Sequence, residues 1–113
     1  MPRAIPTDTE TITVCKLADL AEGQTRLIEA GGRKIGVFHC AGGELFAIED
    51  RCSHDDGPLC EGDWDEESCW VVCPRHGSQF DLATGVPRSL PATQPVPTYP
   101  VRMVDGKVVV ELP

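Results

Sequence analysis

The chain has 113 residues, and its 18 Asp and Glu residues outnumber its 10 Lys and Arg residues, which gives a formal net charge of -8. Such a length corresponds to one domain with a modest core. The acidic surplus argues against nucleic-acid binding, which depends on Lys and Arg at phosphates. There is also no polybasic segment to hold an anionic membrane surface. With 11 glycines and 10 prolines, a long helical bundle is excluded because helix breakers recur along most of the chain.

The N-terminal segment and the cysteine content predict a cytoplasmic protein. No apolar run approaches the ~20 residues that span a bilayer. Residues 1–10 contain proline and acidic residues where a signal peptide needs an apolar stretch. Thiols stay reduced in the cytoplasm, so the six cysteines favour metal ligands or buried thiols over disulfides.

Short strands joined by tight turns are predicted along the chain. They are expected at residues 11–14, 25–30, 33–40, 44–48, 69–73, 101–104 and 107–112, with one helical turn near residues 17–21. Gly31-Gly32 and Asp105-Gly106 are two-residue hairpin signals. Seven or eight strands without a helical crossover predict an all-β, antiparallel fold, either a small sandwich or an open barrel.

Two stretches interrupt this pattern. Residues 52–67 contain seven acidic residues, and residues 87–100 contain five prolines. Long irregular loops in a compact domain are usually functional. The acidic stretch is expected to be a solvated loop, or alternatively a docking face for a basic partner.

Two Cys/His pairs stand in or beside the irregular region, as Cys52-Ser53-His54 and as Cys73-Pro74-Arg75-His76. Two thiolates with two imidazoles suit either a tetrahedral zinc or an iron–sulfur cluster. A zinc finger usually pairs like ligands in sequence. Here each loop supplies one Cys and one His, which lets both cysteines bind one iron and both histidines bind another.

The paired motifs, with His-Gly-Ser-Gln-Phe-Asp at 76–81, resemble those of the Rieske [2Fe-2S] proteins. More narrowly, the chain resembles the small Rieske-type ferredoxins that serve bacterial non-haem iron oxygenases. This resemblance implies a Rieske fold over a single domain, residues 1–113, with a two-loop cluster-binding subdomain inserted at about residues 50–86. It also implies a [2Fe-2S] cluster in which Cys52 and Cys73 bind the buried iron and His54 and His76 bind the outer iron.

The same resemblance implies a set of residues around the cluster. They are Gly57, Gly77, Ser78, Phe80 and Pro91. The glycines let backbone approach an inorganic centre, and the Ser78 hydroxyl is expected to reach a bridging sulfide. The segment around Pro91 is expected to cover the other side of the cluster.

Rieske potentials span roughly -150 to +300 mV, and this chain is expected near the lower end. High-potential members brace their two loops with a disulfide, but the corresponding positions here are Gly57 and Arg75. Those members also have a tyrosine donor where this chain has Phe80. The acidic loop further disfavours an added electron. Imidazole ligation predicts that the potential falls as pH rises past the pKa of the ligand histidines.

The expected function is one-electron transfer with no catalytic site of the chain's own. The resemblance implies two partners, a flavin-dependent reductase and a terminal oxygenase of the ring-hydroxylating type. We expect a monomer, because the acidic chain has no long apolar stretch. Three alternatives are a redox sensor or iron–sulfur-assembly accessory, an electron-transfer subunit held permanently in an enzyme, and a structural zinc module.

Four cysteines and one histidine remain outside the predicted ligand set. Cys15, Cys40 and Cys69 are expected to be small buried apolar groups. Cys60 lies in the first ligand loop and is a candidate for exposure and redox reactivity, with a Cys60–Cys69 disulfide as an alternative. His39 is expected to be a structural or surface residue.

Overall fold

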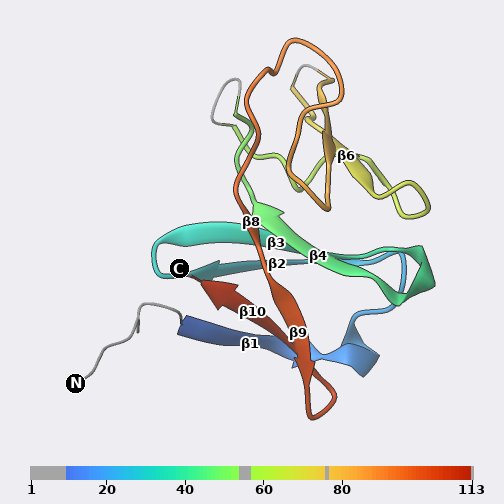
Figure 1. Ribbon diagram of the computed structural model, residues 1–113, viewed down its shortest axis with the longest axis vertical. Coiled ribbons are helices and arrows are strands. Elements are labelled where there is room, and N and C mark those ends of the chain that lie inside the picture. The colour runs from blue at the N-terminus through green and yellow to red at the C-terminus, as the bar shows by residue number, and fades with distance from the viewer. Residues whose placement is uncertain (1–9, 54–56, 76, 113) are drawn as a thin grey trace.

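The computed structural model describes residues 10–53, 57–75 and 77–112, which form strands, turns and short 3-10 helices (Figure 1). The strands make three antiparallel sheets, with orders β2-β3-β4-β8, β1-β10-β9 and β5-β6-β7. Within these residues, no helix has the length and apolar character needed to cross a membrane.

The largest sheet is built on the first predicted hairpin. It contains β2 (Thr25–Ala30), β3 (Arg33–His39), β4 (Leu45–Glu49) and β8 (Thr98–Tyr99). Gly31 and Gly32 join β2 to β3 with φ angles of 61° and 78°, the left-handed region that favours glycine. Gly31 and Gly32 therefore form the hairpin turn that the sequence predicted.

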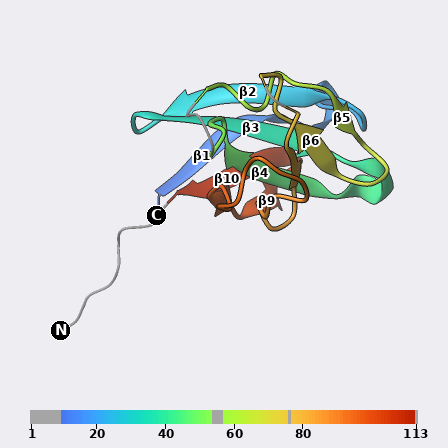
Figure 2. The same ribbon diagram turned by 90° about the horizontal axis from the view of Figure 1, so that it is seen from above.

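The second sheet packs against the first. It contains β1 (Glu10–Lys16), β9 (Val101–Val104) and β10 (Lys107–Leu112), and the predicted Asp105-Gly106 turn joins β9 to β10. Figure 2 shows the two sheets lying over one another. One core lies between them and includes Leu20, Ile35, Val37, Tyr99, Val108 and Val110. Only Pro100 separates β8 from β9, so the chain passes directly from one sheet to the other.

The third sheet lies at one end of the molecule (Figure 1) and contains β5 (Trp64–Asp65), β6 (Trp70–Val72) and β7 (Gln79–Asp81). A second core joins it to the largest sheet. Phe38 of β3 and Ile48 of β4 are fully buried there with Val71, and the Phe38 ring meets Trp64 edge-on at 5.0 Å. This second core fixes the position of the irregular loops relative to the sheets.

The all-β, antiparallel prediction is confirmed, and the sheets do not close into a barrel. The described residues form ten strands, more than the predicted seven or eight. Three of them, β5, β7 and β8, were not predicted, because strands of two or three residues are too short to show an alternating pattern. The predicted helical turn is a 3-10 helix at Leu17–Asp19.

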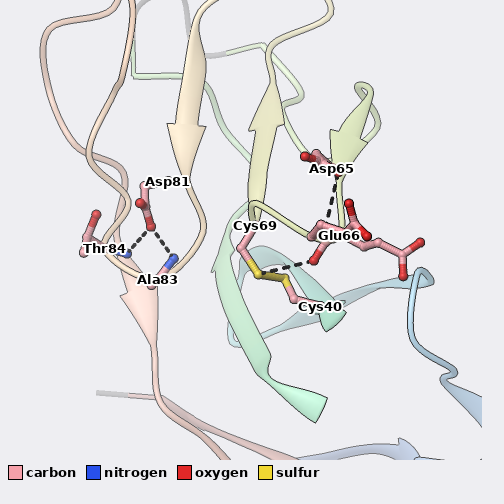
Figure 3. Close-up of a disulfide and its surroundings, with 8 residues drawn as sticks. Cys40, Asp65, Glu66, Cys69, Asp81, Ala83 and Thr84 are labelled. Atoms are coloured by element: carbon pink, nitrogen blue, oxygen red, sulfur yellow. Dashed lines mark hydrogen bonds between the residues drawn. A yellow bond between two sulfur atoms is a disulfide. The ribbon is translucent and has the colours of Figure 1, made fainter. Parts of the chain in front are cut away.

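Cys40 and Cys69 form a disulfide (Figure 3), so the prediction that both are buried thiols is wrong, and so is the Cys60–Cys69 alternative. The chain places the pair together because the turn between β5 and β6 docks on the end of β3. There, the Ala41 amide donates a hydrogen bond to the Glu66 carbonyl at 2.9 Å. The two cysteines are 29 residues apart, and no local sequence pattern predicts that they pair.

The two other cysteines outside the predicted ligand set have different surroundings. Cys15 is only partly buried, on β1, and packs against the core between the first two sheets. Cys60 is 4% exposed, so the prediction of an exposed Cys60 is wrong. Burial, and then the nearby Asp50 carboxylate, hold the pKa of the Cys60 thiol far above its usual range, which keeps the sulfur protonated and unreactive.

His39 has the structural role that the sequence predicted. Its side chain is 8% exposed, and its Nδ1 lies 2.8 Å from the Leu20 carbonyl oxygen. This hydrogen bond links the end of β3 to the segment after β1.

The Cys40–Cys69 disulfide is expected to stabilise the fold by constraining the unfolded chain. For a closed loop of this length, replacing both cysteines by serine is expected to lower the free energy of unfolding by about 3 to 4 kcal/mol, measured by chemical denaturation. Thiol titration of denatured, metal-free protein should find four thiols before reduction and six after it. Six thiols before reduction would contradict this assignment.

Candidate metal centre

The first candidate loop follows β4. Cys52 lies three residues after the end of that strand, and its residue is fully buried. Its backbone N–H donates a hydrogen bond to the Gly57 carbonyl at 2.8 Å. The chain therefore closes on itself over five residues and returns beside the buried thiol.

The second candidate loop follows β6 and is closed in the same way. Cys73 is 1% exposed, and its N–H donates to the Ser78 carbonyl, again five residues later, at 2.8 Å. The Gly77 amide also donates to the Cys73 carbonyl at 3.0 Å. Gly77 adopts a φ of 83°, a conformation that a side chain at this position would strain.

The two loops meet in the second core. Cys52 and Cys73 belong to the same buried cluster, together with Leu59, Phe80 and Leu82. Buried thiolates are good ligands for a soft metal centre only where opposite charge compensates them, and iron supplies that charge. The cysteine half of the predicted ligand set therefore fits an iron–sulfur cluster. The other half, His54 and His76, lies outside the described residues.

A strap of residues 87–94 runs along both loops. From the second loop, Ser78 Oγ accepts a hydrogen bond from the Ala92 amide at 2.9 Å. From the first loop, Ser53 Oγ donates to the Gln94 carbonyl. The Gln79 amide donates to Ser89 Oγ at 2.9 Å, which ties β7 to the same strap.

Three of the residues that were predicted to surround the cluster lie in or beside this arrangement. Ser78 is fully buried, and because its oxygen accepts from Ala92, its proton remains available for a further acceptor. Phe80 is fully buried in the core that contains both cysteines. Pro91 follows a cis peptide bond in the strap, next to Leu90, whose residue is 77% exposed.

Two cavities border the loops, as outlined by the described residues. A cavity of about 410 Å³ lies beside the second loop and is lined by Glu61, Asp63, Cys73, Pro74, Arg75 and Gly77, among others. A larger one, about 780 Å³, lies between the β2–β3 hairpin and the flank of the first loop. Its lining includes neither Cys52 nor Cys73.

Sequence reasoning did not single out several residues at this site. Asp50 Oδ1 accepts hydrogen bonds from the backbone amides of Leu59 and Cys60, at 2.8 and 2.7 Å. The strap contacts of Ser53 and Ser89 were missed as well. In each case the partner lies 9 to 41 residues away, and no local pattern marks such a bond.

Known proteins resemble the chain over most of its length. A model of the Rieske [2Fe-2S] domain matches residues 10–100. The 3-phenylpropionate/cinnamic acid dioxygenase ferredoxin subunit of Escherichia coli (strain K12) is 41% identical over 102 residues, which cover 90% of this chain and 93% of that protein.

Solved ferredoxin structures share the fold. The ferredoxin of carbazole 1,9a-dioxygenase from Nocardioides aromaticivorans IC177 superposes with a TM-score of 0.82 at 31% identity, over 88% of this chain and 95% of that one. A chain in a complex of reduced oxygenase and oxidized ferredoxin in carbazole 1,9a-dioxygenase has a TM-score of 0.81 at 33% identity, over 88% and 91%. The chain belongs to the Rieske [2Fe-2S] domain family, and its cofactor is a Rieske-type [2Fe-2S] cluster.

Proposed function

We propose that the protein is a one-electron carrier that binds its cluster through Cys52, His54, Cys73 and His76. It receives electrons from a flavin-dependent reductase and passes them to a terminal oxygenase of the ring-hydroxylating type. One observation carries this proposal. Two buried cysteines lie in two loops with the same backbone closure, in a chain 41% identical to a dioxygenase ferredoxin subunit.

We propose that residues 1–113 form a single Rieske domain with a cluster-binding subdomain at about 50–86. The separate sheet of β5, β6 and β7 supports this division, because it shares the second core with both cysteine loops. We further propose that the carrier acts as a cytoplasmic monomer.

When bound, the cluster supplies a site that accepts and releases one electron. Cys52 and Cys73 would hold one iron inside the second core, where the apolar neighbours exclude water. Ser78 Oγ accepts the Ala92 hydrogen bond, which leaves the hydroxyl proton available for an acceptor on the cluster. Gly57 and Gly77 have no side chains, so the backbone of each loop can approach a bound cluster closely.

Charge and exposure favour a protein partner with a basic surface. The chain carries a net charge of -8, and Glu61 and Asp63 line the cavity beside the second loop. Complementary charge accelerates encounter between proteins. Leu90 offers an exposed apolar contact on the strap that touches both loops.

The first test of the proposal is the identity of the metal centre. Dithionite-reduced protein is expected to give a rhombic EPR signal averaging near g ≈ 1.9, with about two irons per chain. Replacing Cys52 or Cys73 by serine is expected to abolish or alter this signal, since each removes a thiolate ligand. A Cys15→Ser control, outside both loops, is expected to keep it. Protein with one zinc, no iron and no signal would instead support a structural zinc module.

A second prediction concerns the reduction potential. The midpoint is expected near the lower end of the Rieske range, and a value above about +100 mV would contradict this. Phe80→Tyr adds a hydroxyl donor and is expected to raise the midpoint, because a hydrogen bond to a ligand sulfur favours the reduced cluster. Phe46→Tyr, at a partly buried position against the same core, serves as the control. Equal midpoints for both variants would argue against the role given to Phe80.

A third prediction concerns the partners. Stopped-flow absorbance should record reduction of this protein by a flavin-dependent reductase and its reoxidation by a ring-hydroxylating oxygenase. Both rates are expected to fall as salt rises, because screening weakens attraction to the acidic chain. Reduction without reoxidation by any ring-hydroxylating oxygenase tested would favour the redox-sensor alternative.

A further inference from the structure

Asp50 fastens both ends of the segment that carries the first pair of predicted ligands. Its Oδ1 accepts hydrogen bonds from the Leu59 and Cys60 amides, at 2.8 and 2.7 Å. Its own backbone N–H donates to the carbonyl of Lys34, on β3, at 2.7 Å. Asp50 thus joins residues 50, 59 and 60, the two ends of the 51–58 loop, and we call these joined ends the neck of the loop. The bond to Lys34 attaches the neck to the largest sheet.

The far side of the neck is fixed by packing. Leu59 is fully buried in the second core with Cys52 and Cys73, and Cys60 is 4% exposed. Cys60 sits over Gly36 of β3 so closely that a Cβ built on Gly36 would lie 2.5 Å from the Cys60 Sγ. The neck therefore has little freedom to shift, provided that Asp50 holds the two amides against the strand.

The two hydrogen bonds that the Asp50 carboxylate accepts belong to the stronger, charge-assisted class. An ionised carboxylate makes shorter and stronger hydrogen bonds with amides than a neutral acceptor does. Leu59 and Cys60 are also buried, so removal of the carboxylate would leave two donors without an acceptor in a part of the fold with little access to water. The loop would then have to change its path to satisfy them.

We propose that Asp50 is a positioning residue for the cluster, because it closes the neck of the loop that presents Cys52 and His54. This inference rests on the proposed function, in which those two residues are ligands. Asp50 acts through the backbone of the loop and does not itself bind iron. Replacing Asp50 should therefore weaken the retention of the cluster while the three sheets remain folded.

The chain contains a matched control for this idea in Asp81, at the end of β7. Asp81 Oδ1 accepts hydrogen bonds from the Ala83 and Thr84 amides, at 2.8 and 3.3 Å (Figure 3). The chemistry is the same as at Asp50, but the turn that Asp81 closes carries no predicted ligand. Comparing variants at the two sites distinguishes the effect of losing an ordinary turn-capping carboxylate from the effect of losing a residue that positions a ligand.

The experiment compares wild type with Asp50→Ala, Asp50→Asn, Asp81→Ala and Asp81→Asn in the full chain. The rate of cluster loss to an iron chelator and the EPR spectrum of the reduced protein are measured, and circular dichroism monitors the fold. Asp50→Ala is expected to lose its cluster at least tenfold faster than Asp81→Ala, a difference of about 1.4 kcal/mol, and to show shifted g values. Asp50→Asn is expected to fall between wild type and Asp50→Ala, because its amide oxygen can still accept.

Equal rates of cluster loss in Asp50→Ala and Asp81→Ala, with unchanged g values, would overturn the inference. If Asp50→Ala fails to fold, the asparagine pair decides, and equal rates in Asp50→Asn and Asp81→Asn would overturn it in the same way. A wild-type protein without the Rieske signal would overturn the proposed function itself, and this is seen before any variant is compared.

Discussion

The second core is the constraint on which the rest of the site depends. Phe38 and Ile48 extend it from the largest sheet, and Phe80 extends it from the third sheet. Cys52 and Cys73 are buried members of the same core, so apolar packing brings together two cysteines that are 21 positions apart in the chain. Hydrogen bonds within the two cysteine loops, to Asp50 and to the strap then hold the loops in shape. Division of the fold into two cores leaves the sheet of β1, β9 and β10 free to stabilise the domain without contributing to the site.

The two loops are joined by the strap. The first loop reaches it through Ser53 and Gln94, and the second through Ser78 and Ala92. The positions where high-potential relatives carry a bridging disulfide are Gly57 and Arg75 in this chain. Hydrogen bonds to a shared strap thus provide a connection between the loops that the sequence alone gave no reason to expect. The disulfide that does form, Cys40–Cys69, instead joins the third sheet to the end of β3.

Sequence reasoning succeeded where a short local pattern has one physical outcome. Gly31-Gly32 specified a hairpin, and the Cys/His spacing with the following His-Gly-Ser motif specified the family. It failed where the partner is distant. The Cys40–Cys69 pair depends on the docking of the β5–β6 turn, and the burial of Cys60 depends on the absence of a side chain at Gly36. Neither condition can be recognised until the sheets are assembled.

The surroundings of the six cysteines bear directly on which of them can bind iron. Cys40 and Cys69 are joined to each other. Cys60 is kept protonated, because burial and the Asp50 carboxylate raise the pKa of its thiol. Cys15 lies on β1 and packs against the other core. A thiolate ligand must lose its proton and lie beside a second ligand, and only Cys52 and Cys73 combine burial in one core with loops closed in the same way. These surroundings support Cys52 and Cys73 as the proposed sulfur ligands. The Asp50 carboxylate contributes twice, since it raises the pKa of the Cys60 thiol and accepts two hydrogen bonds at the end of the loop that carries Cys52.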